Sequence, residues 1–369
     1  MDFQLSEDQR AFADMAQGLF ADFCNDEQLR AHDVSGAPYM RELWQQCVAA
    51  GLHSILLPEA QGGLGLGLTE LMAVLEQQGR ALALLPLWEQ QLTAAALARF
   101  APQQAEPLLA GIMAGEVLTI SLSGLSASRG HGLRLSGDRL YGQVAAVPLG
   151  DLASHALLAL VDEAGTERLA LASLSDSAVT RERGFSQHHL GVADLHFASV
   201  PVLALLPAEA TGWVEQRAIA CAAALQLGVT QQQLRRTVEY VSERRQFERP
   251  IGSFQLVAGQ MADGHIATEA LRASLWQLVW RLDQGLPSTP QAHATRALAN
   301  ELGHRAGHMA QHVHGGMGVD VTYPMHRFLY WSRALGALLG GSEHHLAKLG
   351  DWLADNDNLG WKYDLPEDC

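Results

Sequence analysis

The sequence predicts an α+β protein that is mostly helical, with an N-terminal helical domain, a small central antiparallel β domain and a C-terminal helical bundle. Three observations along the chain indicate this order. Apolar residues recur three and four positions apart up to about Ala114, short strand-like segments follow, and long helical patterns return from Trp213. These changes place the domains at residues 1–115, 116–205 and 206–369.

The N-terminal domain is predicted to contain helices joined by short loops. Residues 12–23 (FADMAQGLFADF) and 68–85 (LTELMAVLEQQGRALALL) carry apolar side chains at helical spacing. Glycine and proline at residues 34–38 and 58–67 interrupt the pattern. We therefore expect separate helices on either side of each interruption.

The central domain is predicted to be built of short strands. Its segments include VLTISLSG, GLRLSGDRLYG, HALLALVD and RLALASL, which lie between Val117 and Leu205. Several of them are bounded by Gly, Asp or Ser. Alternating segments with turn residues at this spacing are typical of a small antiparallel sheet.

Five helical patterns make up the C-terminal domain. They cover residues 215–247, 254–285, 290–316, 323–341 and 342–354. The first would be one helix of unusual length, and no internal repeat or low-complexity linker divides the set. We expect these helices to pack together as a bundle.

Composition narrows the class of protein. The formal net charge of −15 argues against a nucleic acid partner, because phosphate binding needs a basic face. No uncharged apolar run approaches the roughly 18 residues that span a bilayer, and the polar, acidic start MDFQLSEDQRAF is unlike a signal peptide. The four cysteines lie far apart and form no CxxC pair, which suits a reducing cytoplasm.

Two motifs suggest functions that their surroundings do not favour. The glycine run QGGLGLGL (residues 61–68) lies among helices, whereas a dinucleotide fingerprint needs a preceding strand, so a flexible connection is favoured. Three histidines spaced four apart, with a fourth just beyond, could offer imidazoles to a metal. No HExxH motif, Cys or carboxylate completes that set, so polar interface or core histidines are favoured. The four are His304, His308, His312 and His314.

Two further segments leave a structural and a functional interpretation open. In SERRQFERPIGSFQ (residues 242–255), three arginines could be a solvated helix end or a fork of guanidinium groups aimed at a pyrophosphate. In HVHGGMG (residues 312–318), adjacent glycines could end a helix or let the backbone approach a flat or charged ligand.

Taken together, these segments resemble the acyl-CoA dehydrogenase family over essentially the whole chain. The matching stretches, in the family's order, are MDFQLSEDQR, LPEAQGGLGLG, LEQQGRALALLPL, ERRQFERPIGSFQ, HGGMGVDVTYPMHRF and GGSEHHLAKLG. The resemblance implies the acyl-CoA dehydrogenase fold with a C-terminal four-helix bundle. It also implies FAD as cofactor, an acyl-CoA substrate and an electron-transfer flavoprotein as electron acceptor. In the family a glutamate removes the α proton while the β hydrogen leaves as hydride to FAD.

The flavin-contacting positions implied by the resemblance are mostly kept. In the family these residues touch the FAD of a neighbouring subunit. The corresponding residues here are Arg244, Gln246, Phe247, Gln255, His312, Gly315 and Gly316. Two departures are the replacement of the motif's glycine by Glu248 and of its glutamine by His312.

The positions implied for the catalytic base carry no carboxylate. In most members the glutamate lies fifteen residues after the proline of the YPxxR segment, which is Leu339 here. In other branches it lies on the long helix, at a position that corresponds to Gly228. Glu343 is a weak candidate, because a glutamate there also suits the start of a helix. We therefore expect no catalytic residue in this chain.

The segments implied to hold the flavin ring are also altered. Family members carry a Thr-Glu-Pro-x-x-Gly-Ser-Asp stretch and a Trp-Ile-Thr or Trp-Ile-Ser stretch in the β domain. Residues 121–132 (SLSGLSASRGHG) and 142–153 (GQVAAVPLGDLA) contain neither Glu-Pro nor Trp. We therefore expect the chain to support a neighbour's FAD but to hold its own poorly.

This combination resembles the base-lacking subunit of the heteromeric bacterial acyl-CoA dehydrogenases that act on steroid-CoA thioesters. It implies an α2β2 heterotetramer, a homologous partner that carries the glutamate, and a cholesterol-like or bile-acid-like side chain as substrate, with polycyclic ring fragments as an alternative. Two alternatives stay open. One is a homomeric enzyme with a relocated base at Glu343 or Glu239, and the other is a flavin-free scaffold that keeps only the fold.

Overall fold

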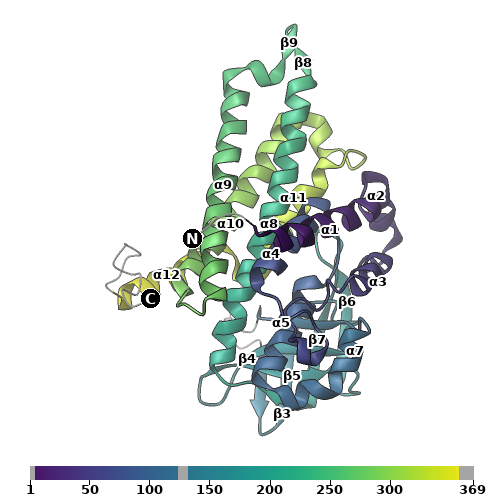
Figure 1. The fold of residues 1–369 in the computed structure, drawn as a ribbon, viewed down its shortest axis with the longest axis vertical. Coiled ribbons are helices and arrows are strands. Elements are labelled where there is room, and N and C mark those ends of the chain that lie inside the picture. Colours follow the sequence, from purple (N-terminus) through teal and green to yellow (C-terminus); the bar gives the residue numbers. More distant parts are fainter. Residues whose placement is uncertain (1–4, 124–131, 357–369) are drawn as a thin grey trace.

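A central sheet lies between two groups of helices along the chain (Figure 1). The computed structural model describes residues 5–123 and 132–356. The longer helices are α1 (Glu7–Phe23), α2 (Asp26–Ser35), α3 (Arg41–Ala49), α4 (Leu68–Ala81), α5 (Leu87–Phe100), α8 (Glu209–Glu243), α9 (Gln255–Asp283), α10 (Thr289–His314), α11 (Met325–Ala337) and α12 (Gly341–Asp355). The short ones are α6 (Pro102–Ala105) and α7 (Leu109–Met113). The predicted α+β, mostly helical order is confirmed, while the domain boundaries at residues 115 and 205 stay predictions.

The sheet strands alternate in direction with one exception. They are β1 (Leu118–Ser121), β2 (Leu133–Ser136), β3 (Arg139–Pro148), β4 (His155–Val161), β5 (Glu167–Ser173), β6 (Val179–Phe185) and β7 (Gly191–Leu205). Their order is β1-β4-β5-β7-β3-β2, and β6 also pairs with β7. The strands β1 and β4 are parallel, which differs from the predicted purely antiparallel sheet. The reason is topological. Strands β2 and β3 come between β1 and β4 in the sequence but lie at the other end of the sheet, so a crossover and not a tight hairpin connects β1 to β4. A crossover connection allows the two strands to run parallel.

Polar caps and a left-handed residue set the ends of the N-terminal helices. Ser6 and Gln9 form reciprocal hydrogen bonds at the start of α1, which satisfies amide groups that the helix leaves free. The helix predicted over residues 68–85 is wrong in its last turn, because α4 ends at Ala81 and Leu82 adopts a φ of 56°. Pro86 also disfavours a helical conformation in Leu85, the residue before it.

α4 and α8 cross at two glycines. A Cβ atom at Gly79 would overlap the backbone oxygen of Leu225, and one at Gly228 would overlap that of Glu76. Because neither glycine has a side chain, the two backbones come into direct contact. This crossing ties the N-terminal helices to the long helix of the bundle.

The C-terminal helices form the elongated part of the molecule (Figure 1). The predicted long helix is confirmed as α8, which spans 35 residues. The hairpin of β8 (Arg245–Gln246) and β9 (Arg249–Pro250) connects α8 to α9 at the end of the bundle far from the sheet. One continuous hydrophobic core runs through the N-terminal helices, the sheet and the bundle. Among the described helices, none combines the length and the apolar content that a membrane crossing requires.

Candidate functional site

The position implied for the base is occupied by Leu339, in a tight connection between two helices. α11 ends at Ala337, the turn η6 (Leu338–Gly340) follows, and α12 begins at Gly341. Leu339 has a left-handed backbone with a φ of 62°, which is uncommon for a residue other than glycine. Its side chain is half-buried and cannot accept a proton.

Leu339 lines a cavity of about 460 Å³ that all three parts of the chain enclose. Helices α4, α5, α8 and α11 and the sheet each contribute to the wall. The large apolar residues that line the cavity are Leu84, Leu85, Trp88, Ile120, Leu122, Phe185, Leu190, Leu225, Trp331, Leu335 and Leu338. A concave site of this size with mainly apolar walls is typical of small-molecule binding.

A pair of buried histidines, one of which bonds to Leu339, stabilises the turn. His345 lies 2.8 Å through Nε2 from the carbonyl oxygen of Leu339, and its Nδ1 lies 2.9 Å from Nδ1 of His293. The carbonyl only accepts, so Nε2 of His345 must donate, and its Nδ1 then accepts from His293. Burial, and next the nearby Arg296 charge, lower the pKa of His345 to about 3, which keeps this neutral arrangement.

A buried arginine holds the same turn. Arg296 on α10 is 0% exposed, and its Nη2 donates to the carbonyl oxygens of Leu335 and Leu338. Burial lowers its pKa to about 9. Hydrogen bonds from α10 and α12 therefore fix the shape of the turn, although it carries no proton acceptor.

The other positions considered for a base lie away from the cavity. Gly228 is at the crossing with α4, where no side chain fits. Glu343 is exposed in the first turn of α12. Glu239 is exposed on α8, where it forms an ion pair with Arg235. None of these three residues lines the cavity.

One carboxyl group that the sequence did not suggest does line the cavity. Glu89 on α5 is 3% exposed and is the only Asp or Glu among the described residues of the wall. Burial raises its pKa to about 8, and hydrogen bonds from its own backbone and from Trp88 oppose this less strongly. Residues Leu87 to Leu97 are all buried, so α5 has no exposed face and helical periodicity could not single Glu89 out.

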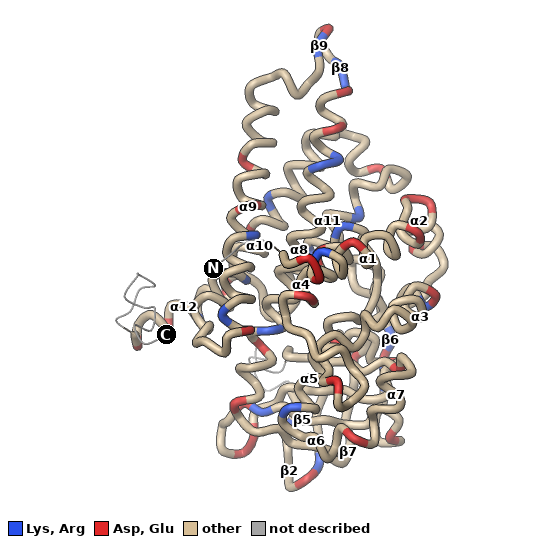
Figure 2. The backbone as a smooth tube through the Cα atoms, viewed as in Figure 1, with Lys and Arg blue, Asp and Glu red and all other residues tan. Residues whose placement is uncertain are grey.

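The first group of implied flavin contacts lies at the far end of the bundle. Arg244 ends α8, Gln246 is in β8, Phe247 is in the hairpin turn and Gln255 begins α9 (Figure 1). All four are exposed, and 87% of Phe247 is accessible to solvent. Figure 2 shows basic residues on both strands of this hairpin and an acidic one, Glu248, at its tip.

The second group lies at the same end. His312 and the two glycines Gly315 and Gly316 are exposed where α10 ends. The ring of His314 stacks on Tyr240, one turn before Arg244, with 4.2 Å between ring centroids. A Cβ atom built on either glycine would meet no atom within 4 Å, so the surface above them is open. The seven implied flavin contacts therefore lie at one end of the bundle, although the first, Arg244, and the last, Gly316, are 72 positions apart in the sequence.

The hairpin turn at Phe247 and Glu248 provides a test of local strain. Both residues have positive φ values, 51° and 65°, as a two-residue type I′ turn requires. We expect Glu248→Gly to raise the free energy of unfolding by about 1 kcal/mol, because glycine adopts this conformation without strain. Urea denaturation would measure the change. Glu243→Gly, in the helical backbone of α8, should instead destabilise the protein. A lower free energy of unfolding in both variants would show that the backbone at Glu248 is not strained.

The β-domain segments implied to hold a flavin ring offer small side chains. Ala145, Ala146 and Pro148 from residues 142–153 line the cavity. Of residues 121–132, positions 124–131 lie outside the described residues, while Ser121 and Ser123 contribute to the wall. The wall therefore has no indole or Glu-Pro group at these described positions.

The glycine run and the spaced histidines belong to the local structure of the chain. The glycine run connects the turn η1 (Glu59–Gln61) to α4 without a strand. His304 and His308 pack edge to face with ring centroids 4.5 Å apart, whereas the ring of His314 stacks elsewhere. Within the described ranges, no three His, Cys, Asp or Glu side chains are placed to bind a metal.

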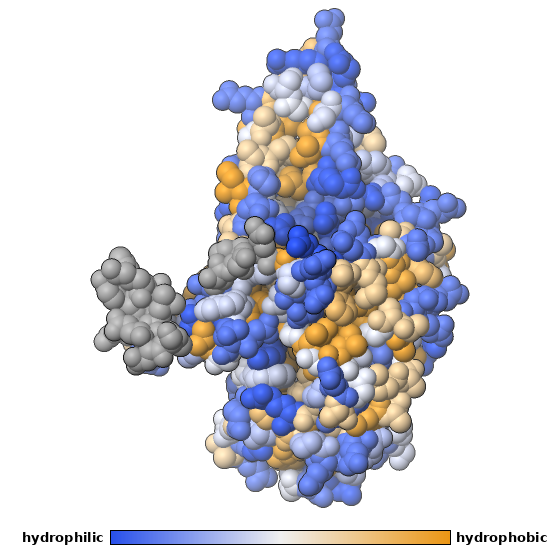
Figure 3. All heavy atoms as spheres, viewed as in Figure 1, coloured by the Kyte–Doolittle hydropathy of each residue, from blue (hydrophilic) through white to orange (hydrophobic). Residues whose placement is uncertain are grey.

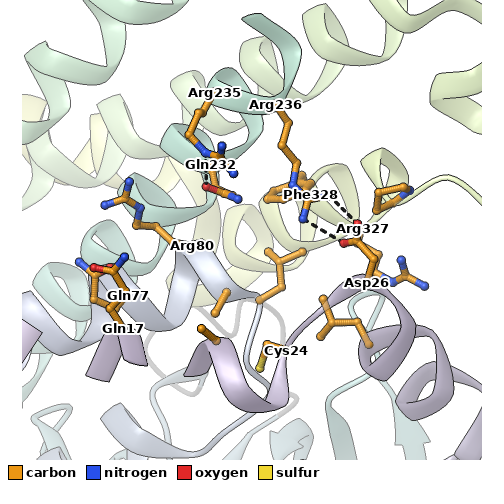
Figure 4. A pocket seen from close by; sticks show the side chains of 15 residues that line it. Gln17, Cys24, Asp26, Gln77, Arg80, Gln232, Arg235, Arg236, Arg327 and Phe328 are labelled. Carbon is orange, nitrogen blue, oxygen red and sulfur yellow. Dashed lines mark hydrogen bonds and ion pairs between the residues drawn. The ribbon is translucent and has the colours of Figure 1, made fainter. Parts of the chain in front are cut away.

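A second cleft, lined by four arginines, lies between the N-terminal helices and the bundle (Figure 4). Three of them are paired with carboxylates: Arg236 forms two hydrogen bonds with Asp26, Arg327 lies 2.7 Å from Asp33, and Arg235 forms its ion pair with Glu239. Figure 4 shows Arg235 beside Gln232, with Arg80 of α4 close to both. The pairs made by Asp26 and Asp33 join α2 to α8 and α11, so polar contacts in this cleft hold the helices together.

Comparison with known proteins identifies the family. Residues 6–116 match the model of the acyl-CoA dehydrogenase N-terminal domain, and residues 215–354 match that of the acyl-CoA dehydrogenase C-terminal domain. The chain belongs to the acyl-CoA dehydrogenase family, whose members are FAD-dependent oxidoreductases.

The similar proteins include steroid-related members. Acyl-CoA dehydrogenase FadE27 of Mycobacterium tuberculosis (strain ATCC 25618 / H37Rv) is 33% identical over 374 residues, which cover 96% of this chain and 99% of FadE27. A variant of the Tcur3481-Tcur3483 steroid ACAD has a TM-score of 0.89 at 36% identity, over 95% of this chain and 98% of that chain. The ChsE4-ChsE5 complex from Mycobacterium tuberculosis has a TM-score of 0.89 at 32% identity, over 96% of this chain and 100% of that chain.

Proposed function

We propose that this chain is the base-lacking subunit of an α2β2 acyl-CoA dehydrogenase that introduces a double bond into a steroid-CoA thioester. One observation carries the proposal. The residue at the implied base position is Leu339, in a turn that His345 and Arg296 hold in place. A carboxylate from another subunit would then have to remove the α proton of the substrate.

The exposed end of the bundle supports a role in binding FAD for a neighbour. Arg244 offers a guanidinium group suited to a pyrophosphate, and Phe247 offers a ring for stacking. The open surface above Gly315 and Gly316 lets a flat or charged group reach the backbone. When bound, FAD would accept the β hydrogen as hydride. The task of this chain is to orient the cofactor from outside the partner's cavity.

Exposed apolar residues near this end support a protein interface there. Figure 3 shows hydrophobic surface over α9, close to the far end of the bundle. Large apolar side chains exposed on α9, in the hairpin and after α10 are Phe247, Leu256, Ile266, Met317, Val319 and Val321. Groups of exposed apolar residues of this kind mark interaction sites. A homologous subunit that carries the glutamate is the partner we propose, and an electron-transfer flavoprotein is the proposed electron acceptor.

The steroid substrate rests on the similar proteins. One solved neighbour is described as a steroid ACAD, and that neighbour and the ChsE4-ChsE5 complex each pair two unlike chains. We extend both features to this chain, with a cholesterol-like or bile-acid-like side chain as the group that is oxidised.

A homomeric enzyme with a relocated base is less well supported. Glu343 and Glu239 are exposed and do not line the cavity. Glu89 does line it, but its carboxyl group is predominantly protonated at neutral pH and so is a poor proton acceptor. A flavin-free scaffold is the alternative outside catalysis, and the spectrum of the assembled complex separates it from the shared site.

Co-expression tests the proposed function. We expect the purified single chain to hold little FAD and to show no dehydrogenase activity, whereas co-expression with the partner gives a yellow, active heterotetramer. Flavin absorbance per subunit and turnover of a steroid-CoA thioester are the measurements. Stoichiometric FAD and turnover by this chain alone would refute the proposal, and a colourless complex would favour the scaffold.

Arg244→Ala tests the contact made across the interface. We expect the dissociation constant of FAD from the complex to rise about 10- to 150-fold, because a charge-assisted hydrogen bond is worth roughly 1.5–3 kcal/mol. Flavin fluorescence released on dilution measures the change. Arg305→Ala, which removes an exposed arginine paired with Glu301 on α10, is the matched control. Equal retention in wild type and Arg244→Ala would count against the assignment.

A further inference from the structure

The two groups of implied flavin contacts are joined by one buried ring. His314 is the last residue of α10 and is 3% exposed. Its ring stacks on that of Tyr240 on α8, with 4.2 Å between ring centroids and 21° between the ring planes. Stacked rings of this kind stabilise a contact beyond the area that they bury. The pair therefore fixes the last turn of α10 against α8.

Tyr240 connects the stack to the first group of contacts. The backbone amide of Arg244 donates to the carbonyl oxygen of Tyr240 at 2.8 Å, and the amide of Ile251 donates to the carbonyl oxygen of Arg244, also at 2.8 Å. Arg244 is thus bonded on one side to the residue with the stacked ring and on the other to the segment that follows the hairpin. A displacement of Tyr240 would move Arg244 and the hairpin that carries Phe247.

His314 connects the stack to the second group. Its Nδ1 lies 2.8 Å from the carbonyl oxygen of Ala310, which only accepts, so Nδ1 donates. The turn η5 (Gly315–Val319) folds back against the same residue. A Cβ atom on Gly318 would lie 2.7 Å from the backbone oxygen of Gln311 and 3.2 Å from Cβ of His314, so only glycine allows this approach. The turn with the two glycine contacts therefore rests on His314.

A third ring completes the cluster. Tyr323 follows the turn, and its ring centroid lies 5.5 Å from that of His314, with 45° between the planes. Burial lowers the pKa of His314, and the hydrogen bond to Ala310 opposes this less strongly, so the ring is neutral at neutral pH. His314 thus contacts α8, its own helix and the segment after η5 at the same time.

We propose that His314 is a positioning residue for the dinucleotide held by the partner subunit, and that its stack on Tyr240 sets the spacing between the contacts at the end of α8 and those at the end of α10. The inference rests on the proposed function, because the partner's FAD is the ligand. His314 is buried and acts through its neighbours. Less conformational freedom is lost on binding when both groups of contacts are already in place.

Removal of either ring tests the proposal in the co-expressed complex. We expect His314→Ala to raise the dissociation constant of FAD about fivefold, the effect of losing one aromatic pair. Tyr240→Ala should have an effect of similar size. The double variant should lose no more affinity than either single variant, because all three lack the same contact. Flavin fluorescence released on dilution measures the change.

Three variants separate positioning from general packing. His314→Phe keeps a flat ring and loses the hydrogen bond to Ala310, so FAD affinity should stay within about twofold of wild type. His308→Ala is the matched control, because it removes an exposed ring on the same helix that packs on His304. Leu278→Ala opens a cavity in the core near the other end of α9. It should destabilise the protein and leave FAD affinity unchanged.

Amide hydrogen exchange of the full chain without its partner tests the spacing separately from flavin. The hydrogen-bonded amides of Arg244 and Ile251 should exchange about fivefold faster in His314→Ala, because the end of α8 loses its contact with α10. The His314→Phe and His308→Ala variants should exchange like the wild type. Unchanged exchange in His314→Ala would show that the stack does not hold the hairpin in place.

Three outcomes in the complex would overturn the proposal. They are unchanged FAD affinity in His314→Ala, multiplied losses in the double variant, and an equal loss in Leu278→Ala. A loss of FAD in Arg244→Ala with none in His314→Ala would leave the proposed flavin contacts standing and refute the positioning role alone. A colourless wild-type complex would refute the proposed function and, with it, any role of His314 toward flavin.

Discussion

Gly228→Ala is expected to lower the free energy of unfolding by about 3 kcal/mol, measured by urea denaturation followed by circular dichroism. The added Cβ atom would overlap the backbone oxygen of Glu76 and lie 2.8 Å from the amide nitrogen of Arg80. Both contacts are backbone atoms of α4, so no side chain can rotate away and the two helices must separate. A glutamate at Gly228 would destabilise the protein further, which excludes this position for a restored base.

Gly212→Ala is the matched control for this prediction. Gly212 is on the same helix, and a Cβ atom there would meet nothing within 4 Å. Replacing glycine by alanine in an open helical position stabilises by roughly 0.5–1 kcal/mol. Opposite signs for the two variants would establish the close crossing, whereas a similar small gain in both would contradict it.

Glu89→Gln is expected to change how stability depends on pH. Between about pH 4.5 and pH 8 the unfolded chain ionises Glu89 while the folded protein keeps it protonated, so wild-type stability falls as the pH rises through this window. A shift of this size corresponds to a loss on the order of 5 kcal/mol. The variant has no carboxyl group at this position and should lose that part of the pH dependence.

Urea denaturation at pH 5 and pH 8.5 measures the effect. The stability of Glu89→Gln relative to wild type should increase between the two pH values. Only the wild type has a carboxyl group at this position that ionises in the unfolded chain while it stays protonated in the folded protein. Glu106→Gln, at an exposed position, should show no such increase. Parallel pH profiles for wild type and Glu89→Gln would show that the Glu89 carboxyl is not shifted by burial.

Local patterns were sufficient to predict the helices and their order. The 35-residue α8 and its neighbours α9, α10, α11 and α12 follow from apolar residues repeating at the helical period, which depends only on residues close in sequence. The same patterns overextended α4, because the apolar residues after Ala81 belong to a turn that Gln78 holds through two hydrogen bonds. Contacts of that kind have no periodic signature.

Several features of the cavity could not be predicted from local patterns. The parallel pairing of β1 with β4 depends on where the intervening strands pack. The raised pKa of Glu89 depends on burial from all sides, which α5 acquires only when the sheet and α8 cover it. The stacking of His314 on Tyr240, which joins the two groups of implied flavin contacts, links residues 74 positions apart.

The sequence by itself determined the family resemblance, the order of helices and strands, and the presence of Leu339 where a glutamate is implied, because these depend on residue identity and short-range spacing. Only the tertiary structure decided that Gly228 has no room for a side chain, that Glu343 and Glu239 face solvent, and that Glu89 faces the cavity. Burial and direct contact between distant segments set these properties, and neither is encoded in any single stretch of the chain.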